Sequence, residues 1–401
     1  MKIKILVTSL LLSSVSIVSA DSTQDEIALL KEQLKILTQK IEQLEVKTKQ
    51  TEASVKKVAE VKATEASESW ADRIVLSGDL RGRFEYIDER EKDVRKRNRI
   101  RFRVGATAQV NKDLKVGFRL ASGSEDPTST NQSLDGAFST KDIGLDLAYF
   151  TYAFNENLDV TGGKMSNPFY KPGKTPVLWD SDVNPEGLSL GYEVGDWFGT
   201  LAGFQVEERS SADDTLLFGG QVSRSFAFGD NRLLAGVGYY DYQNLQGLSP
   251  LFDNNARGNT LDAEGKMAYD FNIVEGMLEY KGKLASQPLT LFATYYQNLE
   301  AGDLDTGYAL GFEFGQVKKA GSWSLGYSYL DVEADAVYAL FNDADFAGGQ
   351  TDSKGHIMKA GYGLRKNMSL GMTYISSEQN QSKATQNDYD RLQLDLAIKF
   401  K

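Results

Sequence analysis

The sequence has no cysteine and only one histidine, His356. These two scarcities exclude disulfides, thiolate metal sites and clusters of imidazole ligands. Beyond residue 20, no apolar run is long enough to cross a bilayer as a helix. The formal net charge of −11 at pH 7 argues against a nucleic-acid partner, because nucleic-acid binders carry a basic excess. We therefore expect no cofactor, no metal site and no nucleic-acid partner.

The one long apolar run stands at the start of the chain, over Ile5–Val18, and two lysines precede it. Small residues follow at Ser19 and Ala20. A short positive segment, an apolar core too short to span a bilayer and a small-residue cleavage site are typical of a secretory signal peptide. We expect residues 1–20 to be removed, so that the mature chain begins at Asp21.

Residues 21–66 have the composition of a helix, with neither proline nor glycine. Their apolar positions alternate at spacings of three and four, which is the a/d seam of a coiled coil. Opposite charges occupy position g of one heptad and position e of the next, as in a parallel assembly. A single amphipathic helix would explain the seam but not these charge pairs, and the seam leaves two or three strands open. The seam is Ile27, Leu30, Leu34, Leu37, Ile41, Leu44, Thr48, Thr51, Val55 and Val58, and the charge pairs are Glu26–Lys31, Lys40–Glu45 and Lys47–Glu52.

After a linker over residues 67–72, alternation of period two replaces the helical period and continues over residues 73–401. In the first segment, apolar Leu80 and Phe84 alternate with Arg81 and Arg83. Segments of about ten alternating residues match strands that cross a bilayer at a tilt. The last segment sets Leu392, Leu394, Leu396, Ile398 and Phe400 against Arg391, Gln393, Asp395 and Lys399.

Tight turns, such as Gly195-Asp196, and long polar loops separate these segments in turn. The long loops are Ser122–Asp142, Met165–Glu186, Asn244–Ala263 and Val332–Gly355. Short turns at one end and long loops at the other are typical of an outer-membrane barrel, and counting gives about sixteen strands. Weak patterning near Leu261 and Phe271 leaves the count open by two. We predict an all-β, transmembrane antiparallel β-barrel of about sixteen strands, preceded by an N-terminal α-helical coiled coil.

Three motifs add to this architecture: Gly162-Gly163-Lys164-Met165-Ser166-Asn167-Pro168-Phe169, Leu178-Trp179-Asp180-Ser181-Asp182 and Pro185-Glu186-Gly187-Leu188. With the coiled coil and the arginines of the first strand, they make the whole mature chain resemble the Gram-negative outer-membrane porins grouped as putative porins. The chain is also similar in plan to the phosphate-selective porins O and P. One departure is Lys401 after Phe400, because porin chains commonly end in an aromatic residue that the assembly machinery reads.

The resemblance implies a water-filled channel for passive diffusion of small hydrophilic solutes and ions, and not an enzyme. It further implies a homotrimer in the bacterial outer membrane, surrounded by lipid and lipopolysaccharide. The coiled coil would then be a stalk in the periplasm, where peptidoglycan is a candidate partner.

A porin filters solutes by the charges that line its lumen. An arginine that faced lipid at the bilayer centre would cost about 2–4 kcal/mol, so the arginines of the first strands are expected to point inward. We call this set the basic wall and expect it to attract anions, because guanidinium groups stay charged and bind carboxylate or phosphate. The alternative is a solvated lumen balanced by opposing acids, since Asp79 and Glu85 share the same face. The basic wall comprises Arg81, Arg83, Arg99, Arg101, Arg103, Lys115 and Arg119.

The loop Met165–Glu186 follows the fifth strand, where porins of this type fold a loop inward to form the constriction. Lys171 and Lys174 could extend the basic wall, and Asp180 and Asp182 could oppose it, which would create a transverse field. An ordinary surface loop is the alternative. The acidic residues of the loop Val332–Gly355, among them Asp335, Asp345 and Asp352, are expected to be solvated at the mouth.

Two other functions are open from the sequence. A barrel hydrolase would use His356, at the junction of a loop and a strand, with Asp352 and Ser353 nearby in sequence. A structural tether would use the coiled coil to join the outer membrane to the cell wall. Asp343-Ala344-Asp345 resembles the start of a calcium-binding loop, but Ala347 and Lys354 stand where oxygen ligands are needed, so we predict no calcium site.

Overall fold

The computed structural model describes residues 22–66 and 70–401, and it divides the chain into one unit that ends at Asp72 and another that begins at Arg73. The predicted signal peptide over residues 1–20 and half of the predicted linker lie outside the described residues. Among the described residues, no helix has both the length and the apolar content to cross a membrane.

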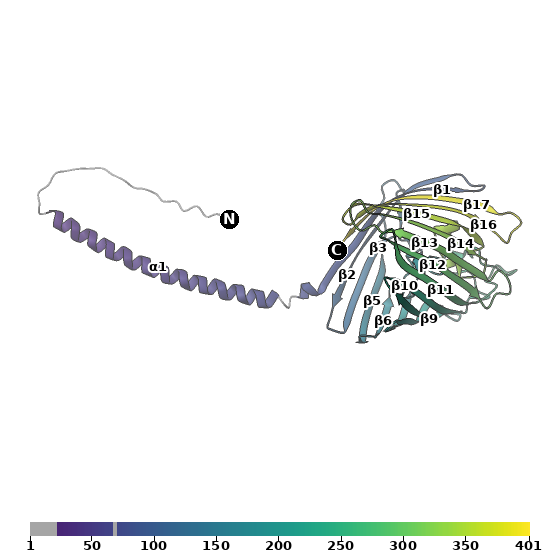
Figure 1. Ribbon diagram of the computed structural model, residues 1–401, viewed down its shortest axis with the longest axis horizontal. Helices are drawn as coiled ribbons and strands as arrows, with labels where there is room; N and C mark the ends of the chain where they lie inside the picture. Colours follow the sequence, from purple (N-terminus) through teal and green to yellow (C-terminus); the bar gives the residue numbers. More distant parts are fainter. Residues whose placement is uncertain (1–21, 67–69) are drawn as a thin grey trace. The chain divides into compact units, whose positions relative to one another are not determined.

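The first unit contains α1 (Ser22–Ala66), a helix of 45 residues (Figure 1). A helix was predicted over residues 21–66, and the described residues 22–66 of this range are helical. Leu34, Leu37, Ile41 and Leu44 of the a/d seam are exposed on this single chain. The pairing of α1 with other helices therefore stays a prediction.

Antiparallel strands make up the second unit (Figure 1). The strands are β1 (Ile74–Glu89), β2 (Arg95–Gln109), β3 (Leu114–Ser122), β4 (Gln132–Ser133), β5 (Ile143–Asn155), β6 (Leu158–Lys164), β7 (Glu186–Val194), β8 (Trp197–Glu207), β9 (Thr215–Phe228), β10 (Asn231–Gln243), β11 (Phe271–Leu284), β12 (Gln287–Asn298), β13 (Thr306–Gly315), β14 (Trp323–Val332), β15 (Ser353–Arg365), β16 (Met368–Gln379) and β17 (Asn387–Phe400). The short helices are η1 (Trp70–Arg73), η2 (Pro172–Lys174), α2 (Leu251–Asn254), η3 (Ala339–Phe341) and η4 (Phe346–Gly349).

The sheet of residues 73–401 closes on itself, because β1 pairs with both β2 and β17. The closing register runs from Gly78 opposite Phe400 to Glu89 opposite Tyr389. The two-residue β4 is not a wall strand, since it lies in the loop between β3 and β5 and pairs with β2 at Arg99. The remaining sixteen strands form the barrel, which confirms the predicted antiparallel β-barrel and its strand count.

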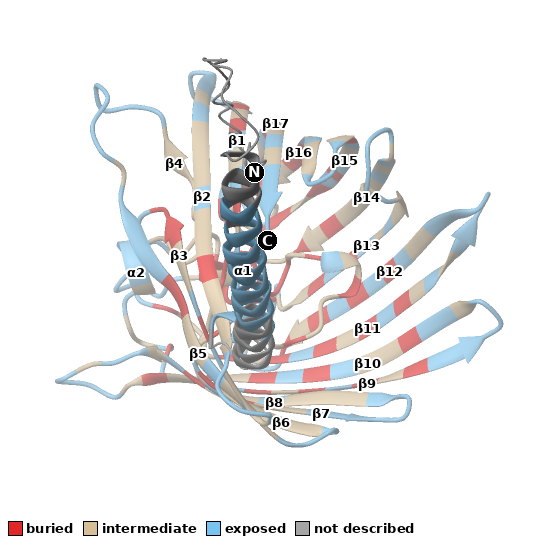
Figure 2. Ribbon diagram, turned by 90° about the vertical axis from the view of Figure 1, so that its left-hand side faces the viewer, coloured by how far each residue is buried: buried red, intermediate tan, exposed pale blue. Residues whose placement is uncertain are grey.

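Alternation along the strands separates an outer apolar face from the inside of the barrel. In β11, for example, Leu278 is 51 % exposed on the outer face, whereas its neighbour Met277 is 3 % exposed and points inward. The inner face of β9–β12 carries apolar side chains, such as Tyr240 and Phe271, beside buried polar ones such as Gln221, and its buried positions form bands along these strands (Figure 2). A hydrophobic core therefore lies inside the barrel.

Four long loops supply the other residues inside the barrel. We number the long loops in chain order, so that L2 is residues 123–142, L3 is residues 165–185, L5 is residues 244–270 and L7 is residues 333–352. L3 contributes Phe169 and Trp179 to the apolar cluster, and L7 contributes Tyr338 and Phe346. The expectation that L7 is a solvated loop is wrong: Asp335 and Asp352 are buried and accept hydrogen bonds from Thr260 and Ser382.

Candidate functional site: the charged wall and the inward loops

The arginines of β1 and β2 lie directly opposite one another. Arg81 pairs in register with Arg101, Arg83 with Arg99, and Asp79 with Arg103. Leu80 and Phe102, which have the opposite parity, are exposed on the outer face. The register therefore concentrates these arginines on the inner face, as their parity predicts.

One group of charges, which we call the arginine cluster, forms around the fully buried Glu85. The Glu85 carboxylate lies 2.7 Å from Arg391 and 3.5 Å from Arg83, and it also forms an ion pair with Arg97. Arg99 lies farther away, at 3.9 Å from Glu85. The members of the arginine cluster are Arg81, Arg83, Arg97, Arg99, Arg391, Glu85, Asp345 and Asp395.

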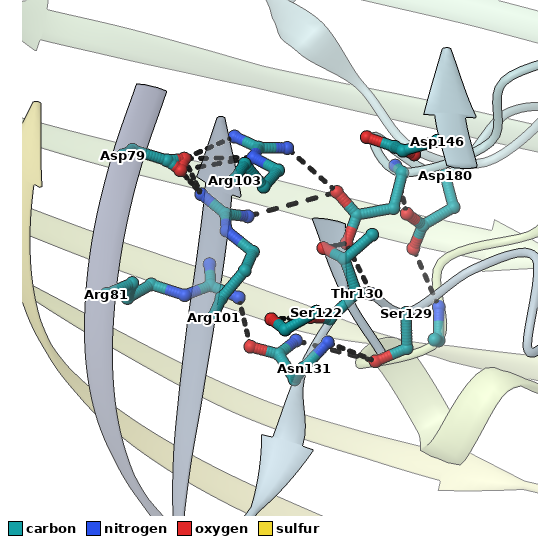
Figure 3. Close-up of polar contacts among 12 residues, drawn as sticks. Asp79, Arg81, Arg101, Arg103, Ser122, Ser129, Thr130, Asn131, Asp146 and Asp180 are labelled. Atoms are coloured by element: carbon teal, nitrogen blue, oxygen red, sulfur yellow. Dashed lines mark hydrogen bonds and ion pairs between the residues drawn. The ribbon is translucent and has the colours of Figure 1, made fainter. Parts of the chain in front are cut away.

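A second group joins the wall to L3 (Figure 3). Asp79 forms ion pairs with Arg101 at 3.1 Å and with Arg103 at 2.8 Å. Asp182 of L3 approaches the same two arginines, at 3.8 Å and 3.5 Å respectively. Asp182 thus opposes the wall. Asp180 does not, because its carboxyl group accepts hydrogen bonds from the backbone N–H groups of Asp182 at 2.7 Å and Ala344 at 3.1 Å.

L2 also reaches the wall (Figure 3). Arg81 donates to the side-chain oxygen of Asn131 at 2.6 Å, and Arg99 donates to the Asn131 carbonyl at 3.0 Å. Thr130 donates its hydroxyl to Asp182 at 3.0 Å. L2, L3 and the wall therefore meet at one place, next to a cleft of about 640 Å³ lined by L2, β5 and L3.

The other predicted residues lie apart from these two groups. Arg119 forms an ion pair with Asp146, and Lys115 stands at the opposite, short-turn end of β3. Lys171 is 3.4 Å from the carbonyl oxygens of Trp179 and Asp180, and burial lowers the pKa of its ammonium group. Lys174 is exposed.

Arg391 and Asp395 were placed on the inner face of the last strand but were not assigned to the basic wall. Because β17 closes against β1, these residues stand beside Arg83 and Glu85. Circular closure of the predicted barrel would have brought them into the site.

L3 is fixed to the far side of the barrel at β11. The Gly173 N–H donates to Glu279 at 2.8 Å, the Tyr170 hydroxyl donates to the same carboxylate, and Lys281 pairs with it at 2.6 Å. Burial and the neighbouring Glu279 raise the pKa of Tyr170, so the phenol keeps the proton that it donates. L3 therefore crosses the lumen from β6 and β7 to β11.

Three carboxyl groups meet where L3 touches L7, and their environments differ. Burial raises the pKa of Asp180, and Asp343 and Asp182 raise it further. Burial and Asp345 raise the pKa of Asp343 to about 6. Burial alone would raise the pKa of Asp345, but Arg391 and Arg83 outweigh burial and lower it. Of these three carboxyl groups, Asp345 is therefore the one whose ionised form the surroundings favour.

The groups considered for a hydrolase do not come together. His356 is exposed on the outer face of β15, with Nδ1 2.9 Å from the Tyr327 hydroxyl. Asp352 is buried and accepts the Ser382 hydroxyl at 2.8 Å, whereas Ser353 donates to a loop carbonyl at 2.9 Å. This arrangement does not form a nucleophile and base pair.

A closed barrel of sixteen antiparallel strands, with charged side chains inside and loops folded into the lumen, defines an outer-membrane channel. The family model described as "Putative porin" matches residues 86–282 and 261–400. The chain belongs to this porin family.

Solved porin structures share the fold at low sequence identity. Pseudomonas putida OprB, in its high-pH structure, aligns with a TM-score of 0.57 and 13 % identity over 82 % of this chain and 95 % of OprB. Salmonella typhi OmpF, in a complex with daunomycin, aligns with a TM-score of 0.53 and 12 % identity over 83 % of this chain and 99 % of OmpF. No curated protein sequence matches significantly. The similarity in plan to the phosphate-selective porins O and P stays a prediction.

Proposed function

We propose that this porin passes small hydrophilic solutes and ions by passive diffusion and prefers anions. The observation that carries the preference is the unequal composition of the arginine cluster, in which five arginines meet three carboxylates. In the second group, by contrast, two arginines balance Asp79 and Asp182. The positive excess therefore belongs to the arginine cluster.

Within the arginine cluster, Arg81 and Arg99 have the weakest compensation. The nearest carboxylates are 3.9 Å away in both cases, from Asp395 and Glu85 respectively. Both guanidinium groups donate to Asn131 of L2 instead. Because a guanidinium stays ionised at any physiological pH, these two side chains supply a permanent positive field beside the solute path.

The selectivity test compares two double variants that each remove two charged side chains from one wall. Arg81→Gln with Arg99→Gln removes two positive charges, so the reversal potential in a salt gradient should shift toward cations. The shift should be largest at low salt, because screening acts over about 10 Å at 0.1 M. Planar-bilayer recording measures it.

The matched control is Asp79→Asn with Arg101→Gln, which removes one charge of each sign and leaves the net charge unchanged. We expect its reversal potential to stay close to that of the wild type. An unchanged potential in the Arg81–Arg99 variant at low salt, or an equal shift in both variants, would refute the anion preference carried by these arginines.

We infer that α1 is a periplasmic stalk that joins three chains. The support for this is a seam of apolar side chains that the single chain leaves exposed to water: Leu34, Leu37, Ile41 and Leu44. Burying apolar side chains is favourable, and a coiled coil would bury this seam between its helices. The opposite charges at the g and e positions favour parallel helices, and the porin fold favours a trimer.

Deleting residues 25–61 should weaken the oligomer and leave the barrel folded, since the barrel is a separate unit from residue 73. Mass determination in detergent is the measurement, with unheated gel mobility as the check on the barrel. A monomeric mass for the intact chain would contradict the stalk.

A further inference from the structure

L7 is buried to an unusual degree for a loop that connects two barrel strands. Val337, Ala336 and Phe346 are 0 % exposed, and Tyr338 and Leu340 are also buried. Connecting loops normally run over the surface, because their backbone polar groups need water or other partners. L7 therefore behaves as an internal element of the barrel.

L7 is anchored at its start by aromatic contacts and by L5. The Tyr338 ring lies 5.5 Å from the rings of Phe271 and Tyr242 on the strands. Asn259 of L5 donates to the carbonyl oxygens of Ala334 and Val337 at 2.7 Å and 3.0 Å. The backbone of L7 thus has the partners that a buried loop requires.

The middle of L7 is joined to L3. Phe341 stacks on Trp179, with ring centroids 5.9 Å apart. The Asp180 N–H donates to the Phe341 carbonyl at 2.7 Å, and the Ala344 N–H donates back to the Asp180 carboxyl group at 3.1 Å. The two loops therefore hold each other through a ring contact and two hydrogen bonds.

The tip of L7 is fixed to the wall where the barrel closes. Asp345 lies 2.7 Å from Arg391 on β17 and 3.2 Å from Arg83 on β1. The next turn is held by Gln379 on β16, which donates to the Ala347 carbonyl at 2.7 Å. L7 starts at β14 and returns to β15, so its tip has crossed to strands beyond its own attachment points.

L3 and L7 together form a continuous bridge across the lumen. L3 is bound to β11 through Glu279, L3 meets L7 at Trp179 and Phe341, and L7 is bound to β1 and β17 through Asp345. Solutes can pass only beside this bridge, so its L7 half limits the open cross-section as directly as its L3 half.

We propose that L7 is a second constriction element, held by Asp345 between Arg83 and Arg391, and that it sets the largest hydrophilic solute the pore admits. The proposal rests on the proposed channel function. Asp345 acts here as a positioning residue for the loop. Its carboxylate also offsets part of the positive charge of the arginine cluster.

Two variants loosen L7 in different ways. Asp345→Asn removes the ion pairs at the tip, and Phe341→Ala removes the ring contact with L3 without changing charge. Both should raise single-channel conductance and shift the size limit in liposome swelling toward larger sugars. Only Asp345→Asn should also move the reversal potential toward anions. The matched control is Asp303→Asn, an exposed aspartate in the loop of residues 299–305, which should leave all three readouts unchanged.

Each outcome decides the proposal. Variants that insert and conduct with the wild-type conductance and size limit would overturn the role of L7 while leaving the channel function intact. Absence of conductance in the wild type would instead overturn the channel function. If both variants fail to insert, Phe341→Leu provides a milder change. Failure of that variant too would make L7 a folding element, which also overturns the proposal.

Discussion

Replacing Glu85 by glutamine should destabilise the folded barrel by about 3–5 kcal/mol, because removing one partner of a buried ion network leaves the other charges uncompensated. The Glu85 side chain is 0 % exposed and has four guanidinium groups around it, from Arg83, Arg97, Arg99 and Arg391. One of these comes from β17, so Glu85 also joins the two strands whose pairing closes the barrel. Without the carboxylate, like charges would face one another across that seam.

Unheated gel mobility and urea unfolding in vesicles report the loss as a smaller folded fraction and a lower unfolding midpoint. The control is Glu89→Gln on the same strand, because within the described residues Glu89 forms its ion pair with Lys92, and the two side chains are 17 % and 66 % exposed respectively. An ion pair that reaches the surface contributes about 0–1 kcal/mol, so this variant should unfold much more like the wild type than the Glu85 variant. Equal stability of the Glu85 and Glu89 variants would show that the network does not depend on Glu85.

The strands could be predicted because one face of each must be apolar toward lipid. Leu80 and Phe84 in β1, and Leu394 and Leu396 in β17, repeat with the period of two that a lipid-facing strand imposes. The tight turns then fixed the segment boundaries. This is why the architecture and the strand count follow from the sequence.

The weak patterning near Phe271 has a physical cause that the sequence did not reveal. Phe271, Ile273 and Met277 of β11 point inward and are buried, while Val274 and Leu278 are exposed on the outer face. The inner face mixes these apolar side chains with the buried Glu275 and Glu279, so the polar half of the alternation is irregular. The inner face is apolar in part because L3 and L7 pack on it, and loop packing has no periodic signature.

The charge partners of the wall could be predicted only in part. The arginines of β1 and β2 share one parity and adjacent strands, so local pattern is enough to place them. Arg391, Asp395 and Asp345 come from the other end of the chain, and only barrel closure and the inward course of L7 bring them to the wall. An acidic loop residue such as Asp345 looks the same in sequence whether it is solvated or buried in an ion pair.

Gly173→Ala should release the tip of L3 from the barrel wall and raise single-channel conductance. Gly173 has a φ of +56°, and a Cβ atom there would come within 2.0 Å of the Phe292 ring on β12. Its N–H also donates to Glu279, so the tip cannot move away from the ring without losing that hydrogen bond. Inserting a methyl group into a packed site costs about 1–3 kcal/mol, in addition to the strain of a positive φ.

Gly195→Ala separates the steric effect from the backbone strain. Gly195 lies in a tight turn with a φ of +60°, and a Cβ atom there would meet nothing within 4 Å. Both variants therefore impose similar strain, but only Gly173→Ala collides with the wall that holds L3. Conductance and the sugar size limit should rise in the Gly173 variant alone. Equal conductance and an equal size limit in the two variants would contradict this role of the close approach at Phe292. The contact of L3 with L7 through Trp179 would then be the stronger anchor of L3.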